Sequence, residues 1–251
     1  MPLDVHQFPC LNDNYGFLVR DRATGTVGCI DTPDAEAILA ELGRLGWRLD
    51  MIINTHWHPD HAGGNARLQA ETGCTIVGPR EVTRIAPLDR PVGEGDVVEL
   101  GETRLEVLET GGHTLGHLSF YDPADAVVFV GDTLFALGCG RLFEGTAEQM
   151  WTSLGKLAAL PDETLVYCAH EYTAANARFA LSVDDSPALK SRAEAVFAAR
   201  QRGEPTVPTR IGAEKAANPF LRAPQLAAGQ GAASDAEAFA AVRRAKDAFK
   251  G

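Results

Sequence analysis

The chain has 251 residues, a formal net charge of −11 and a pI near 5.1, a balance that argues against nucleic acids and anionic membranes as partners. Its five cysteines lie at wide, irregular spacings without a Cys-x-x-Cys pair, which argues against a disulfide framework and a zinc ribbon. The first residues lack an export signal and no run approaches ~18 apolar residues, so we expect a soluble, cytoplasmic protein with no membrane partner, and a monomer.

Residues 1–173 alternate between short apolar runs, often β-branched, and helical patterns. In chain order, the runs predict strands over residues 15–19, 26–30, 51–54, 75–77, 97–100, 104–108, 126–130 and 164–168. The helical patterns cover residues 33–45, 64–73 and 146–160. A chain that mixes strands and helices in this way is expected to form a layered α/β sandwich.

Beyond residue 172 the strand pattern ends and the composition becomes rich in alanine. A Ser-Pro pair at 186–187 predicts the start of one helix, and a Ser-x-x-Glu capping box at 234–237 predicts the start of the last helix. We therefore expect a main domain over residues 1–173 and a helical appendage over residues 174–251.

Six of the seven histidines fall into three short clusters, and each cluster follows directly after an apolar run. The first is Thr-His-Trp-His-Pro-Asp-His at 55–61, the second is Gly-Gly-His-Thr-Leu-Gly-His at 111–117, and the third contains His170. Asp132 follows a fourth apolar run. Loops at the carboxyl ends of strands are where α/β folds form their sites, so we expect these side chains to converge. Imidazole and carboxylate ligands suit zinc, iron or manganese, and the lack of thiolates argues against a closed structural zinc site.

Seven candidate ligands are too many for one tetrahedral ion and suit two ions that share a carboxylate. One arrangement places His56, His58 and His113 on the first ion and Asp60, His61 and His170 on the second, with Asp132 bridging. A water that bridges two metals has its pKa pulled toward ~7. We therefore expect a bridging hydroxide as nucleophile, with Asp60 and Asp132 as catalytic residues.

Two residues near these clusters each have two interpretations. His117 either lies behind the ligands, in a supporting or structural role, or is itself a ligand. Asp31, which ends a predicted strand, either orients a ligand histidine or only forms a turn. His6 lies outside every cluster and is given no role.

The His-Trp-His-Pro-Asp-His motif at 56–61 resembles the hallmark of the metallo-β-lactamase superfamily. Segments at 11–15, 131–135, 138–141, 144–146, 170–172, 218–222 and 242–247 are similar to one of its families, glyoxalase II. This resemblance implies a four-layered αββα sandwich whose helical appendage contributes to substrate binding. It also implies hydrolysis of S-D-lactoylglutathione and related glutathione thioesters to a 2-hydroxy acid, here D-lactate, and glutathione, the second step of methylglyoxal detoxification.

The resemblance carries the family's metal ligands onto the same seven positions. It also implies that glutathione is bound by Arg141, Phe143, Tyr172, Arg243 and Lys246. Many family members have lysine at the position of Arg141, which keeps the charge, and tyrosine at the position of Phe143, which loses a hydroxyl. At about 100° per residue, Arg243 and Lys246 share the apolar face of the last helix, whereas Arg244 points elsewhere.

Rival functions stay open. A lactonase or a glutathione-persulfide dioxygenase with one iron would use the same superfamily fold, but the basic last helix favours the glutathione thioesterase. A flavodiiron-type redox protein needs a flavin domain, for which the chain is too short. A non-catalytic metal-binding or scaffold module is disfavoured by an open ligand set that generates hydroxide.

Overall fold

The computed structural model describes residues 3–226 and 230–251, and the chain divides into two compact units. Unit 1 comprises Met1–Glu109 and Gly116–Gly131, and unit 2 comprises Thr110–Leu115 and Asp132–Gly251. Across the described ranges, none of the helices combines the length and the apolar character that a membrane span requires. The expected functional domains, residues 1–173 and residues 174–251, are a different division of the chain and stay a prediction.

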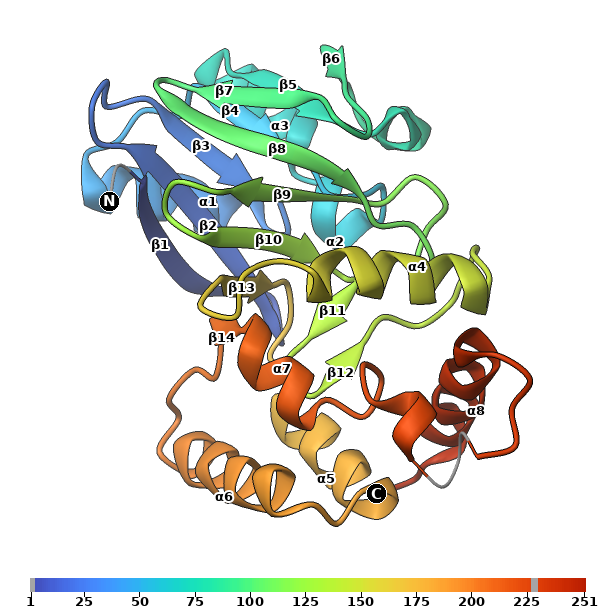
Figure 1. Ribbon diagram of the computed structural model, residues 1–251. Coiled ribbons are helices and arrows are strands. Elements are labelled where there is room, and N and C mark those ends of the chain that lie inside the picture. The colour runs from blue at the N-terminus through green and yellow to red at the C-terminus, as the bar shows by residue number, and fades with distance from the viewer. Residues whose placement is uncertain (1–2, 227–229) are drawn as a thin grey trace. The chain divides into compact units, whose positions relative to one another are not determined.

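The first sheet of unit 1 joins an antiparallel edge to a parallel run (Figure 1). Its strands lie side by side in sequence order, as β1 (Leu3–Cys10), β2 (Asn14–Asp21), β3 (Val27–Ile30), β4 (Met51–Ile53), β5 (Thr75–Gly78) and β6 (Arg90–Pro91). β1 to β3 pair antiparallel, and β3 to β6 pair parallel. The carboxyl ends of β3 and β4 therefore lie at one edge, where Asp31 and the first histidine cluster follow.

Helices α1 (Ala35–Leu45) and α3 (Asn65–Thr72) cover one face of this sheet. α1 begins where the Asp34 carboxylate accepts hydrogen bonds from the N–H groups of Glu36 and Ala37, and it ends at Gly46, whose φ of 66° is left-handed. The core between helices and strands contains Leu18, Cys29, Ile38, Leu42, Ile52, Leu68 and Ile76. The short helices α2 (Pro59–Ala62) and η1 (Arg80–Arg84) complete the helices of this unit.

The second sheet of unit 1 is an antiparallel meander of β7 (Val97–Leu100), β8 (Thr103–Glu109), β9 (Leu118–Asp122) and β10 (Val127–Gly131). The two sheets of the unit face each other, because Phe17 of β2 and Phe129 of β10 have ring centroids 5.9 Å apart. Gly28 of β3 lies so close to Leu100 that an added Cβ would stand 3.2 Å from it. Unit 1 is therefore layered as helices, sheet and sheet, and the predicted α/β class is confirmed.

Unit 2 contains short strands and most of the helices. Its strands are β11 (Leu134–Phe135), β12 (Gly138–Cys139), β13 (Leu165–Cys168) and β14 (Thr209–Arg210), and its helices are α4 (Ala147–Ala158), α5 (Thr173–Val183), α6 (Pro187–Gln201), α7 (Ile211–Ala217), η2 (Ala223–Gln225) and α8 (Asp235–Ala248) (Figure 1). The predicted N-cap of α8 is present, since the Ser234 side chain accepts from the N–H of Glu237. The Glu237 carboxylate reaches back to the N–H of Ala233 at 2.8 Å, one residue before the position that a capping box uses.

The predicted strands and helices are present, with small shifts at their ends. Sequence patterns missed β1 and β9, along with α5 and α7, and they did not predict the two-residue strand β14. β1 contains a histidine and a proline that break its apolar pattern, and β9 follows the second histidine cluster directly. α5 and α7 are short and rich in alanine, so they carry little helical periodicity.

Candidate metal centre and substrate site

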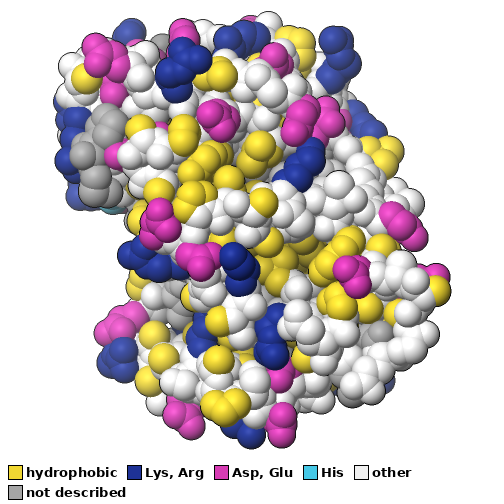
Figure 2. All heavy atoms as spheres, in the orientation of Figure 1, with side chains coloured by type: hydrophobic (Ala, Val, Ile, Leu, Met, Phe, Trp, Pro, Cys, Tyr) yellow, Lys and Arg dark blue, Asp and Glu magenta, His cyan; other side chains and the backbone are white. Residues whose placement is uncertain are grey.

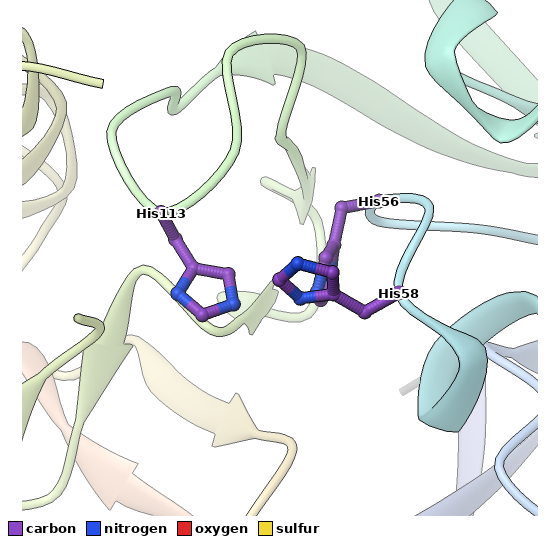
Figure 3. Close-up of side chains that lie close together, drawn as sticks. All are labelled: His56, His58 and His113. Atoms are coloured by element: carbon purple, nitrogen blue, oxygen red, sulfur yellow. The ribbon is translucent and has the colours of Figure 1, made fainter. Parts of the chain in front are cut away.

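Each predicted metal ligand lies directly after a strand or in the helix that follows it. β4 leads into the loop of His56 and His58, and α2 carries Asp60 and His61. Figure 3 shows His56 and His58 on that loop and His113 on the loop that follows β8. In unit 2, the candidate ligands are His113, Asp132 and His170, of which Asp132 follows β10 and His170 follows β13.

Asp31 orients two histidines of unit 1. It adopts a left-handed φ of 57°, which is rare for a residue with a side chain, directly after β3. Its carboxylate accepts from His61 Nδ1 at 2.9 Å and from the hydroxyl of Thr55 at 2.7 Å. Because the Thr55 hydroxyl donates to Asp31, it accepts from His56 Nδ1 at 3.0 Å. Both rings therefore carry their proton on Nδ1 and present Nε2 as an acceptor, which supports the orienting interpretation of Asp31.

The acceptor atoms of unit 1 lie together. His56 Nε2 lies 3.1 Å from His58 Nδ1. Asp60 Oδ2 lies 3.4 Å from His61 Nε2. Two acceptors at such a distance repel each other unless a cation or an added proton lies between them.

Asn14 is a site residue that the histidine pattern could not identify. It begins β2, and its side-chain amide donates to Asp60 Oδ2 at 3.2 Å and to Asp60 O at 3.4 Å. Asn14 is buried, and the contact joins residues 46 positions apart. The signal in the sequence was the Leu-Asn-Asp-Asn-Tyr segment at 11–15, which the resemblance includes but gives no role.

His117 is buried in unit 1 and stacks on His56, with ring centroids 4.8 Å apart and an interplanar angle of 29°. The groups of metal-binding donors found among the described residues do not include it. Its position fits a supporting role behind His56. His6, which was given no role, contacts Glu41 at 2.9 Å.

Asp132 joins the two histidines of unit 2. Its Oδ2 lies 3.4 Å from His113 Nε2, and its Oδ1 lies 3.3 Å from His170 Nε2. His113 Nδ1 donates to the carbonyl oxygen of Arg141 at 2.8 Å, so Nε2 of the neutral ring is an acceptor that faces a carboxylate. One carboxylate with an oxygen toward each of two histidines has the form expected of a bridging ligand.

These donors fit divalent metals. In three histidines the hydrogen bond at Nδ1 leaves Nε2 with a lone pair, which is how metal-binding imidazoles are usually oriented. The facing atoms are carboxylate oxygens or a second imidazole nitrogen, and this set suits zinc, iron or manganese.

Two of the predicted glutathione contacts, Tyr172 and Phe143, lie beside the unit 2 ligands. Tyr172 stacks on His170, with ring centroids 4.7 Å apart and planes within 2°. Phe143 stands edge-on to His113 at 5.2 Å, and its side chain is 61% exposed. Arg141 is exposed, and its Nε lies 3.8 Å from Asp247 Oδ1. Two aromatic rings thus contact the histidines of unit 2, and the Arg141 guanidinium lies near Asp247.

On α8, Arg243 and Lys246 turn inward and Arg244 is exposed, as the helical geometry predicted. Arg243 is buried, and it donates to the carbonyl oxygen of Cys139 at 3.1 Å and to Asp247 at 2.8 Å. Lys246 is half-buried and donates to the carbonyl oxygen of Ala175 at 3.2 Å. Burial, followed by the charges of Arg243 and Arg178, lowers the pKa of Lys246 to about 8.

The five cysteines are buried free thiols. Burial raises the pKa of Cys10 and Cys168 to about 12 and that of Cys139 to about 11. The pKa values of Cys29 and Cys74 are raised by the same cause. Protonated thiols are poor nucleophiles, so none of the five is suited to nucleophilic catalysis.

Comparison with known proteins identifies the family of both parts of the chain. A family model described as the metallo-beta-lactamase superfamily matches residues 26–170, and one described as the hydroxyacylglutathione hydrolase C-terminus matches residues 171–249. The chain is 56% identical to a hydroxyacylglutathione hydrolase of Maricaulis maris, over 98% of each chain. It is 50% identical to one of Erythrobacter litoralis, over 98% of this chain and all of the relative.

Solved structures extend the likeness to the fold. ETHE1 from Myxococcus xanthus is 29% identical, with a TM-score of 0.69 over 96% of this chain and 90% of that protein. TTHA1623, solved in a di-iron-bound form, is 27% identical, with a TM-score of 0.62 over 87% of this chain and all of that protein. From these matches and from the sequence relatives, the chain belongs to the hydroxyacylglutathione hydrolase family of the metallo-β-lactamase superfamily.

Proposed function

We propose that this protein hydrolyses S-D-lactoylglutathione and related S-(2-hydroxyacyl)glutathione thioesters to a 2-hydroxy acid and free glutathione. The observation that carries the proposal is the 56% identity to a protein named hydroxyacylglutathione hydrolase, which extends over both the histidine clusters and the helical appendage. In the methylglyoxal pathway this reaction yields D-lactate.

We further propose two metal ions as the cofactor, with zinc the first choice and iron or manganese as alternatives. The ligands are the seven predicted side chains, with His56, His58 and His113 on one ion, Asp60, His61 and His170 on the other, and Asp132 between them. The two contacts of the Asp132 carboxylate support its bridging role, and a solved relative in a di-iron-bound form supports the number of ions. Bound divalent metals supply Lewis acidity and a water of lowered pKa.

The chain's own residues position the reaction. Asp31 holds His56, through Thr55, and His61 in the tautomer that presents Nε2, and Asn14 orients the Asp60 carboxylate. The leaving group is a thiolate, whose conjugate acid has a pKa near ~8.5, so the reaction needs no separate general acid. This fits the lack of any reactive cysteine or Ser-His-Asp arrangement among the candidate site residues.

We propose residues 1–173 as the catalytic domain and residues 174–251 as the substrate-binding domain. Glutathione carries two carboxylates, and an acidic protein needs local positive charge to bind an anion. Arg141, Arg243 and Lys246 supply that charge, while Phe143 and Tyr172 offer apolar contact. The face drawn in Figure 2 mixes Lys and Arg with Asp and Glu, so its described residues form no continuous basic stripe. A monomer in the cytoplasm, without nucleic-acid or membrane partners, stays a prediction.

The test is release of thiol from S-D-lactoylglutathione by the purified protein, followed with a thiol reagent. We expect release that is lost after metal chelation and restored by added zinc. Oxygen uptake with glutathione persulfide, measured in parallel, separates the thioesterase from a persulfide dioxygenase, and a lactone substrate tests the lactonase alternative. Thiol release that a chelator leaves unchanged would contradict the proposal, as would the absence of release.

A further inference from the structure

The hairpin of β11 and β12 lies directly after Asp132 in the sequence and is completely buried. Its turn places Leu137 at a left-handed φ of 57°. The hairpin also comes very close to α5, because a Cβ on Gly138 would collide with the amide of Asn176. A buried turn has few backbone partners of its own, so its carbonyl and N–H groups need side chains to bond with.

Those partners come from the C-terminal helices and from Asn218, the residue directly after α7. Asn176 Nδ2 donates to the carbonyl oxygen of Ala136 at 3.1 Å, and Arg243 Nη1 donates to that of Cys139 at 3.1 Å. Asn218 Nδ2 lies 3.1 Å from the carbonyl oxygen of Phe135 and 2.9 Å from that of Gly138. The N–H of Leu137 donates to Glu214 Oε2 at 2.9 Å. Each residue from 135 to 139 is thus bonded by a side chain that lies 40 or more positions later in the chain.

Glu214 and Asn218 belong to one hydrogen-bond network that contacts the hairpin. Both are fully buried, and Asn218 Nδ2 lies 2.9 Å from Glu214 Oε2. Glu214 Oε1 accepts from the hydroxyl of Thr209 at 2.6 Å and pairs with the Arg192 guanidinium. A buried carboxylate with this many partners is rigid, and removing one partner leaves others unsatisfied.

The residues at the two ends of the hairpin contact, or are themselves, candidate metal ligands of unit 2. Asp132 lies two residues before β11, and Gly140, directly after β12, approaches so closely that a side chain there would collide with the carbonyl oxygen of Asp132. The next residue, Arg141, provides the carbonyl oxygen that fixes His113 Nδ1 at 2.8 Å. Movement of the hairpin would therefore displace the carboxylate of Asp132. It would also break the hydrogen bond that keeps the proton of His113 on Nδ1.

We infer that Asn176, Glu214 and Asn218 are positioning residues for the metal centre, acting through the β11–β12 hairpin. This inference rests on the proposed role of Asp132 and His113 as metal ligands. On this view, the C-terminal segment has a second task besides glutathione binding, since it holds two of the seven proposed ligands, Asp132 and His113, in place.

The test is a graded series in the full-length protein. Asn176→Ala removes one contact to the hairpin, Asn218→Ala removes both of its contacts to the hairpin and one to Glu214, and Lys215→Ala is the control. Lys215 lies on the same helix as Glu214, but it is exposed and pairs with Asp162 at 2.7 Å. Zinc affinity is measured by competition with a chromophoric chelator, at a temperature where circular dichroism shows every variant folded.

We expect Asn218→Ala to weaken zinc binding by about ten- to a hundredfold, Asn176→Ala to weaken it less, and Lys215→Ala to leave it unchanged. In the enzyme assay, kcat should fall in the same order at fixed zinc, while KM for the thioester stays near that of the parent. If Asn218→Ala does not fold, the comparison of Asn176→Ala with Lys215→Ala decides. Unchanged zinc affinity in the asparagine variants, with only a lower melting temperature, would overturn the inference.

The zinc measurements are independent of the substrate. A parent protein without thioesterase activity, whose variants still show the graded loss of zinc, would contradict the proposed function alone. An active parent whose asparagine variants bind zinc normally would contradict the positioning role alone.

Discussion

The two halves of the candidate metal centre are built in opposite ways. In unit 1 the candidate ligands come from residues 56–61, and Asp31, at the end of the neighbouring parallel strand, orients His61 directly and His56 through Thr55. In unit 2 they come from three separate segments, and a buried hairpin held by four side chains of the C-terminal part of the chain lies between two of those segments. A short motif can therefore encode one half of a metal site, whereas the other half depends on packing across most of the chain.

The largest loss of kcat and of bound metal should come from removing the carboxylate of Asp132 in unit 2 or of Asp60 in unit 1. Asp132→Asn should lower kcat more than about a hundredfold and reduce the content of both metals, because its carboxylate faces two histidines. Asp60→Asn should also lower turnover strongly but reduce the metal content at one site only. Metal analysis of the folded variants measures the difference. Equal metal content in the Asp60 variant and the parent would remove Asp60 from the ligand set.

Asp31→Asn tests how far unit 1 depends on the orientation of its histidines. The amide cannot accept all of the hydrogen bonds that Asp31 accepts from His61 and Thr55, so we expect a ten- to hundredfold loss, roughly, in metal affinity or kcat. Asp34→Asn is the matched control, because Asp34 follows the same strand and only caps α1. A similar loss of activity in the control would mean that the Asp31 effect reflects folding.

Lys246→Ala tests whether α8 binds the substrate. Loss of a charge-assisted contact should lower kcat/KM about tenfold, mostly through a higher KM, because the contact is remote from the reacting carbonyl. Zinc affinity should not change. Arg243→Ala should raise KM as well, and it should also weaken zinc binding because Arg243 bonds to the hairpin.

Arg244→Ala is the control for the Lys246 experiment, since Arg244 is exposed on the same helix. Arg244→Ala should change kcat/KM for glutathione thioesters very little. A small thioester without the peptide should not distinguish Lys246→Ala from Arg244→Ala. Equal effects of Arg244→Ala and Lys246→Ala would show that α8 is not the glutathione-binding element.

The pH dependence of KM should separate Lys246 from the metal centre. Burial lowers the pKa of Lys246 to about 8, so its positive charge is present below that pH and is lost as the pH rises through it. KM for glutathione thioesters should therefore rise severalfold between pH 7 and pH 9. Lys246→Arg keeps its charge over this range and should remove the rise. A rise of the same size in the arginine variant would assign it to another group.

The smallest effect should come from Phe143→Tyr, which restores the hydroxyl that many family members have at this position. Phe143 is 61% exposed, so water competes for the new hydrogen bond and KM should fall by only about twofold. Phe143→Leu serves as the comparison, because it removes the ring and should raise KM. A tyrosine variant with a higher KM than the parent would mean that the hydroxyl has no partner in this chain.

The sequence predicted the candidate metal ligands more completely than the residues that hold them in place. His56, His58 and His61 could be recognised because their spacing is local and they follow an apolar run. Asn14 and Glu214 could not, because each is a single polar residue whose partner lies 46 or 77 positions away. In the fold, the bounds of β7 were predicted to the residue from its apolar run. β9 was missed because it begins directly after the second histidine cluster in the sequence.

The burial of the five cysteines affects how the protein reacts with glutathione disulfide. Exchange with glutathione disulfide requires a thiolate that can reach the attacking sulfur. The thiols of this chain are buried, and their raised pKa values keep them protonated at neutral pH. Buried, protonated thiols exchange slowly, so we expect the protein to resist trapping as a mixed disulfide when its glutathione pool becomes oxidised.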